Sequence, residues 1–533
     1  MFKYALIAAF APLMLVADSL TVRMLPGEEW RGAANYFGSQ MPFDAATELE
    51  IDLTASNYAN QYSSLLISNR GRVIWSDRQA RFFISGGVID VASAAPIKLT
   101  QAGSTLREAF QFASRTYFPP SGTTPDELFF SAPQYNTWIE LTYNQNEKDI
   151  LTYAQSMLDH GLPPGVLMID DTWQTAYGDW DFDARRFEDP KGMVAKLHEK
   201  GFKVILWICP WVGMDTPAYR LLSTGRHPFR KQRQAPGGLY MDAPGRVAVS
   251  EWWNGCSALL DFTHPRGRAW FKGELDRLVG DYGVDGFKLD GGALPRYLSL
   301  KPFDSTATTA EQSNGFAAFA LQYPVCEYRH AFNYGGKPVV MRLHDKNHKW
   351  SDLQAIIPDM IAGGLLGCAF MCPDMVGGGN WVAFTPGEPF EEELFVRSAA
   401  IHALCGQMQF SASPWRVLSA ENQKIICDLV KLRQKFAPRF VELAKESGRT
   451  GEPMMRAMDY VFPGQGYGKI RDQFLMGDDL MVAPVVTKGA VSRSVAIPPG
   501  KWRADDGRIY VGPQKAKIDA PLARLPYFER VTD

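Results

Sequence analysis

The pattern of apolar and polar residues changes twice along the chain and divides it into three regions. Between residues 18 and 130, short runs alternate apolar and polar positions and are broken by Gly, Asn and Ser. Examples are ELEIDLTAS (48–56), SSLLISNRGRVIWSD (63–77) and ARFFISGGVID (80–90). Alternation with a period of two gives a strand one apolar face, and turn residues between the runs favour antiparallel pairing. Residues 18–130 are therefore predicted to form an N-terminal β-sandwich domain.

Strand-like and helix-like segments then alternate over residues 131–451. Strands are predicted at 135–143, 165–171, 202–210, 284–290, 337–343 and 364–371, and helices at 146–161, 189–201 and 265–283. The run VILWI (204–208) is apolar throughout, which is typical of a strand buried on both faces of a parallel sheet. The length of the alternation favours a (β/α)8 TIM barrel over a doubly wound sheet.

The two ends of the chain complete the predicted organisation. Residues 452–533 return to strands and turns, as in 472–486 and 492–513, and are predicted to be a C-terminal β domain. At the other end, Lys3 precedes an apolar run that reaches Ala17 and is followed by Asp18. This pattern predicts a secretory signal over residues 1–17, and a buried first strand is the alternative. We therefore expect a secreted or periplasmic protein with no membrane attachment once the signal is removed.

Composition excludes some partners and cofactors. A net charge of −2 gives no basic face for nucleic acid. Aromatic residues make up 12% of the chain, which suits stacking against sugar rings, although a large core also needs aromatic residues. The seven cysteines are odd in number and scattered, so neither a disulfide framework nor a zinc site is predicted. We expect no metal and no organic cofactor, and the oligomeric state is not predicted.

Charged and aromatic side chains follow the predicted barrel strands. They are Asp170, Asp171 and Trp173 after one strand, Trp211 after the next, then Lys288 and Asp290, Arg342 and Asp345, and finally Asp374. The carboxyl ends of barrel strands meet at one mouth, where active sites lie. A single Asp at such an end is more often a helix cap, but several that converge indicate a site.

Two carboxylates with different roles are typical of glycosidic bond cleavage. One attacks the anomeric carbon, and the other protonates the leaving oxygen and later deprotonates water. Lys288 shares a strand face with Asp290 and is expected to keep it ionised while donating to a sugar hydroxyl. The alternative for Lys288 is a purely structural ion pair.

The chain resembles glycoside hydrolase family 31 over nearly all of its predicted mature length. The resemblance is carried by DFTHPRGRAWF (261–271), DGFKLDGG (285–292), LLGCAFMCPDMVGG (365–378), DQFLMGDDLMVAPV (472–485) and VAIPPGKW (495–502), in that order. The family has an N-terminal β-sandwich, a catalytic β/α barrel and C-terminal β domains, which agrees with the organisation predicted above.

The resemblance implies a role for most of the candidate residues. Asp290 corresponds to the nucleophile, and Asp345 to the acid/base, with Asp352 as the competing position. Asp170 or Asp171, Arg342 and Asp374 match positions that bind sugar, and Trp173, Trp211 and Lys288 are expected to join them from their places at the ends of barrel strands. The implied substrate is an oligosaccharide or glycoside with a terminal α-linked sugar.

Departures from the family pattern bear on which sugar is removed. Gly291 and Gly292 follow the nucleophile position, where their small size is expected to let a sugar ring approach, and SASPW (411–415) stands where many members have a histidine. The segments IDDTW, KLDGG, RLHD, PDMVGG and SPW resemble the α-galactosidase-like branch, with Trp173 expected beside the sugar at C4. An α-glucoside, α-xyloside or α-N-acetylgalactosaminide is the alternative substrate. Transglycosylation and a catalytically silent carbohydrate-binding protein also stay open.

Overall fold

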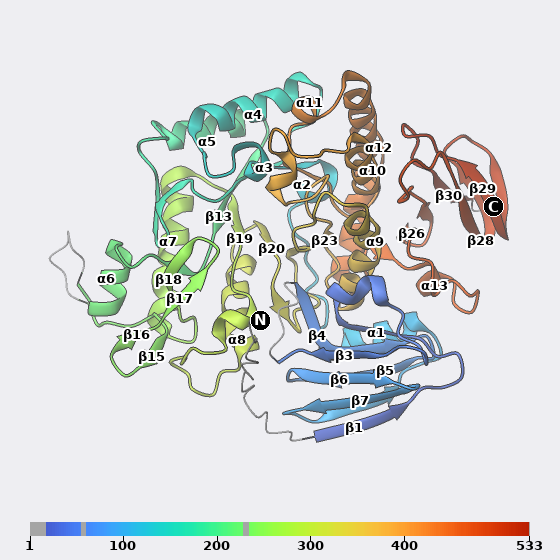
Figure 1. The fold of residues 1–533 in the computed structure, drawn as a ribbon, viewed down its shortest axis with the longest axis horizontal. Helices are drawn as coiled ribbons and strands as arrows, with labels where there is room; N and C mark the ends of the chain where they lie inside the picture. The colour runs from blue at the N-terminus through green and yellow to red at the C-terminus, as the bar shows by residue number, and fades with distance from the viewer. Residues whose placement is uncertain (1–17, 55–59, 227–233, 532–533) are drawn as a thin grey trace, which may run out of the picture.

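A computed structural model describes residues 18–54, 60–226 and 234–531 (Figure 1). The predicted signal, residues 1–17, lies outside the described residues. The chain forms an N-terminal pair of β-sheets, a central barrel and a C-terminal sheet, and Figure 1 shows the two β regions on adjacent sides of the barrel. In the part of the chain so described, no helix is both long and apolar enough to cross a membrane.

The N-terminal region consists of two sheets that face one another across an apolar core. One has the order β1 (Asp18–Arg23), β7 (Val88–Ser93), β6 (Ala80–Ser85), β3 (Leu49–Asp52); the other has the order β2 (Trp30–Ala34), β4 (Gln61–Ser68), β5 (Arg72–Ser76), β8 (Ile97–Gln101). Phe82 and Val91 of the first sheet share the core with Trp30 and Leu66 of the second. The helix α1 (Leu106–Tyr117) follows, and it begins with a capping box of Thr105 and Glu108 within the region predicted to be β-sandwich.

The prediction of an eight-stranded parallel barrel is confirmed. Its strands lie in the order β23, β22, β20, β19, β13, β10, β9, β24, and a parallel bridge between Met375 and Gln409 nearly closes the ring. Their bounds are β9 Gln134–Asn136, β10 Val166–Ile169, β13 Lys203–Ile208, β19 Gly286–Leu289, β20 Val325–Tyr328, β22 Val340–Arg342, β23 Met371–Cys372 and β24 Gln409–Phe410. The same order along the sheet and along the chain brings all eight carboxyl ends to one mouth.

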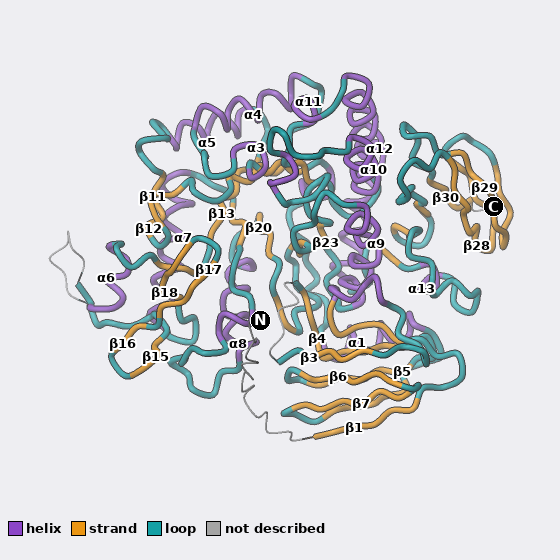
Figure 2. Tube along the Cα trace, in the orientation of Figure 1, coloured by secondary structure: helices purple, strands orange, loops and turns teal. Residues whose placement is uncertain are grey.

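Helices surround the barrel, as Figure 2 shows in purple. The longer ones are α4 (Glu147–Asp159), α5 (Pro190–Glu199), α7 (Pro265–Tyr282), α8 (Thr309–Ala317), α9 (Trp350–Leu365), α10 (Glu392–Ala403) and α12 (Ala420–Thr450). Two predicted strands were wrong in extent. The helix α3 (Trp138–Leu141) replaces most of the strand predicted at 135–143, and α9 occupies the start of the one predicted at 364–371. A short apolar run buried in a helix has the same composition as a buried strand, so periodicity does not separate them.

Small β elements inserted after two barrel strands build the mouth. The hairpin of β11 (Gln174–Ala176) and β12 (Asp179–Phe182) follows β10. After β13 comes a sheet of β14 (Trp211–Val212), β18 (Gly255–Leu259) and β17 (Val249–Trp252). The same insertion carries α6 (Pro217–Thr224), β15 (Met241–Ala243) and β16 (Arg246–Val247).

The C-terminal sheet packs against α12 and carries its own apolar core. Its order is β25 (Met455–Arg456), β26 (Phe474–Met476), β27 (Leu480–Val482), β30 (Tyr527–Val531), β28 (Ser492–Ala504), β29 (Ile509–Asp519). Trp502 is fully buried in this core with Leu475 and Phe528. The pattern of residues 452–533 predicts strands and turns alone, but the short α13 (Met458–Val461) lies between β25 and β26.

Candidate active site

A cavity of about 280 Å³ opens at the carboxyl ends of the barrel strands. It is lined by Trp138, Tyr143, Asp170, Asp171, Trp207, Trp253, Lys288, Asp290, Arg329, Arg342, Asp345 and Met375. Six of the nine residues predicted for the site therefore lie together: Asp170, Asp171, Lys288, Asp290, Arg342 and Asp345.

Asp290 directly follows β19, and its side chain is only 13% exposed. One carboxylate oxygen accepts the Gly291 backbone N–H at 2.8 Å and lies 3.3 Å from Arg329 Nε. The other accepts Trp207 Nε1–H at 3.2 Å. Burial raises the pKa of Asp290, but Arg329, Lys288 and Arg342 together outweigh burial and hold it below its ordinary value. The carboxylate is therefore ionised at neutral pH.

The glycines after Asp290 have a different role from the one expected of them. Gly291 and Gly292 have φ values of 75° and 72°, a left-handed conformation that L side chains rarely adopt. A Cβ on Gly292 would lie 2.8 Å from the ring of Phe316. These positions need glycine for the sharp turn after the strand and for packing, rather than to admit a sugar ring.

Asp345 lies in the loop after β22, on the other side of Arg329 from Asp290. Its Oδ1 accepts Arg342 Nη1–H at 2.7 Å and Arg329 Nη1–H at 2.9 Å. Enclosure in the site raises the pKa of Asp345, but Arg329 and Arg342 lower it by more, so it falls below its ordinary value. Because the side chain is 49% exposed, solvent screens part of this effect.

The competing position Asp352 points away from this cavity. It lies in the first turn of α9, where its Oδ2 accepts the backbone and side-chain N–H groups of Asn347 at 2.6 and 2.8 Å. It closes the loop behind Asp345 and does not line the cavity. The geometry thus favours Asp345 over Asp352.

The adjacent carboxylates Asp170 and Asp171 have unlike surroundings. Asp170 pairs with Lys288 at 2.5 Å, both side chains being buried. The side chains that donate to Asp171 are all neutral: Asn254 Nδ2–H at 2.7 Å, Tyr177 O–H at 3.1 Å and Gln174 Nε2–H at 3.3 Å. Burial and the neighbouring Asp170 raise the pKa of Asp171 to about 7.

Arg342 is oriented by carboxylates below the cavity. Its Nη1 lies 2.6 Å from Asp374 Oδ1, and its Nε lies 3.3 Å from Glu327 Oε1. Asp374 is completely buried, accepts the Lys346 backbone N–H at 2.8 Å and does not line the cavity. Its expected contact with the sugar is therefore replaced by a structural one, which fixes Arg342 and the loop of Asp345.

Two predicted aromatic residues also lie behind the cavity instead of on it. Trp173 is fully buried, donates Nε1–H to the Trp207 carbonyl at 2.8 Å, and packs on Phe182. Trp211 is fully buried and stacks on Trp252 at 5.1 Å between ring centroids. Trp173 directly precedes the hairpin of β11 and β12, and Trp211 begins β14 of the other inserted sheet. Both side chains therefore pack within these insertions instead of facing the cavity.

Sequence reasoning missed Arg329, which contacts both catalytic candidates. It follows β20, a short strand that went unrecognised in PVCEYR (324–329). The proline before an apolar pair and the polar EYR after it were the available signal. Trp207, Trp138 and Trp253 were also missed as lining residues; Trp207 was hidden inside an apolar strand.

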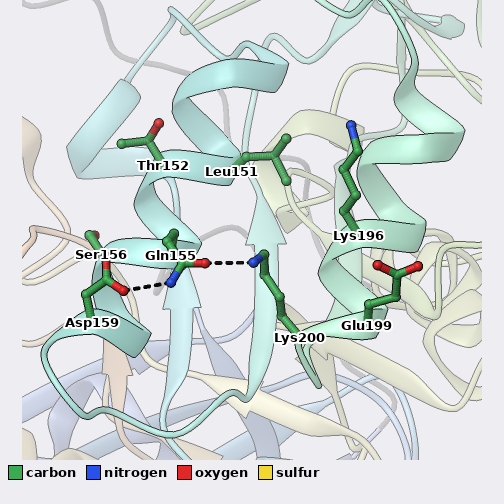
Figure 3. A pocket seen from close by; sticks show the side chains of 8 residues that line it. All are labelled: Leu151, Thr152, Gln155, Ser156, Asp159, Lys196, Glu199 and Lys200. Atoms are coloured by element: carbon green, nitrogen blue, oxygen red, sulfur yellow. Dashed lines mark hydrogen bonds between the residues drawn. The ribbon is translucent and has the colours of Figure 1, made fainter.

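A larger hollow of about 700 Å³ lies elsewhere, on the outer wall between α4 and α5 (Figure 3). Three of its polar side chains form a chain of hydrogen bonds: Lys200 Nζ donates to Gln155 at 2.7 Å, and Gln155 donates to Asp159 at 2.7 Å. Thr152 and Ser156 donate to backbone carbonyls of their own helix. Within residues 18–54, 60–226 and 234–531, no three His, Cys, Asp or Glu side chains are arranged to hold a metal ion.

Comparison with known proteins assigns most of the chain to one family. A model described as the TIM-barrel domain of glycosyl hydrolases family 31 matches residues 133–443, and the C-terminal domain model of that family matches 451–531. The myogenesis-regulating glycosidase of Mus musculus is 33% identical over 443 residues, which are 80% of this chain and 60% of that protein. Alpha-glucosidase 2 of Bacillus thermoamyloliquefaciens is 27% identical over 72% of this chain and 50% of that protein.

Solved structures show the same fold. The family 31 dextranase of Flavobacterium johnsoniae complexed with glucose gives a TM-score of 0.81 at 20% identity, covering 96% of this chain and 66% of that one. An α-xylosidase from a soil metagenome complexed with xylose gives 0.80 at 21% identity, covering 97% and 79%. The chain spans 60% and 50% of the lengths of the two curated relatives named above.

Proposed function

The chain belongs to glycosyl hydrolase family 31, and we propose that it is a retaining exo-α-glycosidase that removes a terminal α-linked galactose. The observation that carries the proposed glycosidase mechanism, though not the identity of the sugar, is the position of Arg329. It follows β20 and pairs with Asp290, which follows β19, on one side and with Asp345, which follows β22, on the other, so two carboxylates line one small cavity from the two strands that flank β20. Double displacement requires this pairing of a nucleophile and an acid/base.

In the first step, Asp290 attacks the anomeric carbon and forms a glycosyl ester. Its environment of cations and N–H donors keeps the carboxylate ionised for this attack. Asp345 gives its proton to the glycosidic oxygen as the bond to the anomeric carbon breaks, and the aglycone leaves as a neutral alcohol. In the second step, Asp345 takes a proton from water, which attacks the anomeric carbon and frees Asp290. Two inversions retain the α configuration.

The acid role of Asp345 requires a proton that its arginine partners disfavour. A bound sugar covers the exposed half of the Asp345 side chain and excludes water, which raises the carboxyl pKa. A glycosidic oxygen beside the carboxyl also favours the protonated form, since that form donates a hydrogen bond. We therefore expect an optimum on the acidic side of neutrality.

The shape of the cavity supports cleavage at a chain end. Its volume lies below the roughly 300–1,000 Å³ of sites for drug-sized ligands, which suits one sugar unit. Asp170, Asp171 and Lys288 supply acceptors and a donor for sugar hydroxyls. The proposal of galactose rests on the resemblance of the segments IDDTW and KLDGG alone, since the buried Trp173 does not line the cavity. The names of two relatives, an alpha-glucosidase and an alpha-xylosidase, make glucose and xylose the second candidates.

We also propose export from the cytoplasm, to the periplasm or beyond, on the strength of the apolar run before Asp18. Asp18 begins β1, the first strand of the sandwich, so removal of residues 1–17 leaves the sheet complete. Terminal sequencing of the protein recovered from its source tests this proposal. Retention of Met1 would contradict it.

A panel of nitrophenyl α-glycosides tests the function, with galactoside, glucoside, xyloside and N-acetylgalactosaminide compared in parallel. We expect the galactoside to be cleaved with retention, and the Asp290→Asn variant to lose activity on every substrate. An NMR time course of the released sugar gives the stereochemistry. Cleavage of another glycoside would replace galactose but keep the mechanism. No cleavage of these substrates or of natural oligosaccharides would favour a silent binding protein.

A further inference from the structure

The loop that carries Asp345 is held from both sides by polar contacts of its neighbours. His344 lies 2.9 Å from Asn60 Nδ2 through its Nδ1, and 3.4 Å from Lys346 Nζ through its Nε2. Lys346 Nζ in turn lies 2.6 Å from Asp359 Oδ2 on α9. Asn60 belongs to the N-terminal β region, so these contacts reach from that region, past Asp345, into the barrel.

The donors and acceptors in this row fix the protonation of His344. A lysine ammonium only donates, so Nε2 of His344 accepts and the imidazole carries its proton on Nδ1. Burial and the nearby Lys346 lower the pKa of His344 to about 4, which agrees with a neutral ring. Nδ1–H then needs an acceptor, and the amide oxygen of Asn60 supplies it when the amide is turned by half a rotation from the orientation with Nδ2 toward the ring.

The N-terminal region also binds the carboxyl ends of two adjacent barrel strands, β20 and β22. Gln61 Nε2–H donates to the backbone carbonyl of Arg329 at 2.7 Å and to that of Arg342 at 3.1 Å. Both arginines pair with Asp345. The segment β21 (Ala331–Phe332), which follows Arg329, joins β4 as a parallel strand of the N-terminal sheet. Gln61 itself is fixed by Asn35 Nδ2–H at 2.6 Å.

The N-terminal region also packs closely on α9, the helix that carries Asp359. A Cβ added to Gly38 would lie 2.5 Å from the backbone of Pro358 on α9. The ring of Tyr36 lies 5.9 Å from that of His344. The elements that carry Asn60 and Asp359 are therefore packed directly on one another, and the loop of His344 and Lys346 lies between these two side chains.

We propose that His344 is a positioning residue for the acid/base Asp345, and that Asn60 of the N-terminal region is its anchor. This inference rests on the proposed function. Asn60 and His344 do not touch the cavity. Their effect on the reaction is to keep the Asp345 carboxyl in line with the glycosidic oxygen, so the N-terminal region is a working part of the catalytic centre.

The choice of leaving group separates this role from a merely structural one. A nitrophenolate leaves without a proton, whereas a sugar alkoxide needs one from Asp345. A displaced acid therefore slows kcat/KM for a disaccharide much more than for a nitrophenyl glycoside. Loss of folded protein or of sugar binding lowers both alike. General acid catalysis contributes roughly 10²–10⁴-fold to the rate, so even a partial displacement of the Asp345 carboxyl can lower kcat/KM for the disaccharide by a large factor.

The experiment compares Asn60→Ala, Asn60→Asp and the control Asn69→Ala with the wild type on both substrates. Asn69 lies in the same region and accepts the Glu29 backbone N–H at 3.0 Å, remote from His344. We expect Asn60→Ala to lower kcat/KM on the disaccharide roughly tenfold or more beyond its effect on the nitrophenyl glycoside. Asn60→Asp keeps an acceptor for Nδ1–H and should restore the ratio. Asn69→Ala should leave it unchanged.

Each remaining outcome overturns the proposal in a recognisable way. Equal losses on both substrates for Asn60→Ala, or an unchanged ratio, would mean that the contact only stabilises the fold. If Asn60→Ala yields too little folded protein, Asn60→Asp decides alone: a shifted ratio in that soluble variant would contradict the role of the acceptor. A wild type that cleaves neither substrate would remove the proposed function itself, and this inference with it.

Discussion

Replacing Arg329 with Gln removes the cation that lies between the two proposed catalytic carboxylates. Its Nε is 3.3 Å from Asp290, and its Nη1 is 2.9 Å from Asp345. A positive charge at this distance favours the ionised form of each carboxyl. Its loss must therefore raise the pKa of both, and the bell-shaped dependence of kcat/KM on pH must move to higher pH on both limbs. The acidic limb moves because Asp290 ionises at a higher pH, and the alkaline limb moves because Asp345 keeps its proton to a higher pH.

The size of the shift follows from burial and from the cations that stay. An adjacent opposite charge changes a carboxyl pKa by about 1–3 units. Asp290 is 13% exposed but keeps Lys288 and Arg342 nearby, so we expect about 1–2 units on the acidic limb. Asp345 is 49% exposed and keeps its direct pair with Arg342, so solvent screening reduces its shift to about one unit or less.

The assay is the pH profile of kcat/KM on a cleaved nitrophenyl glycoside, which reports the free enzyme. The two pKa values that define the limbs belong to the interacting pair Asp290 and Asp345 rather than to either residue alone. The pH position of the whole profile is therefore compared between wild type and variant. Arg329→Lys retains a charge and should move the profile less. Arg78→Gln removes a surface cation paired with Glu311 and should not move it. A profile of Arg329→Gln that stays in place, or moves to lower pH, would refute the assignment of Arg329 as the shared counter-ion.

Three further substitutions test single residues of the site. In the wild type, KM should fall as pH rises through about 7, because Asp171 ionises there and accepts hydrogen bonds from sugar hydroxyls better. Asp171→Asn should raise KM and abolish this pH dependence. If the KM of the variant still changes with pH, another group is responsible. Trp173→Phe should lower the free energy of unfolding by about 1–3 kcal/mol in a denaturant titration, because the Trp207 carbonyl loses its buried donor, without changing the ratio of galactoside to glucoside cleavage. A changed ratio would return Trp173 to the sugar site. Trp253→Ala should raise KM several-fold at nearly unchanged melting temperature, since its ring lines the cavity and is 48% exposed, and an unchanged KM would exclude it from substrate contact.

The sequence was sufficient for the barrel because its strongest signals are local. The apolar run of β13 and the amphipathic α4 and α5 each follow from a short window of residues. Acidic residues placed directly after β10 and β19 needed only the rule that functional groups follow barrel strands. That rule located Asp170, Asp171 and Asp290, and all three line the cavity.

The predictions that were wrong or missing concern contacts between residues far apart in the chain, which no short stretch of sequence reveals. Whether Trp173 faces the sugar or the core depends on the hairpin of β11 and β12 that folds over it, and Asp374 turns to Arg342 rather than to the cavity. Arg329 was missed because its strand has only four residues, Val325–Tyr328, and two of them are polar or charged in a buried interior. Glu327 is tolerated there only because Arg342 and Gln409, distant in sequence, satisfy it.

The arrangement of charges explains why this mouth holds so many carboxylates. Asp290, Arg329, Asp345, Arg342 and Asp374 form a row in which each acid lies beside a base. A neutral sugar brings no charge of its own, so the protein alone must set the ionisation of the nucleophile and of the acid. The alternating row ionises Asp290 before any substrate arrives. It leaves the half-exposed Asp345 as the paired acid whose surroundings a substrate changes most. In the proposed mechanism, the proton needed for the first step is therefore taken up where the sugar binds, and the ionisation of Asp345 responds to the substrate more than that of Asp290 does.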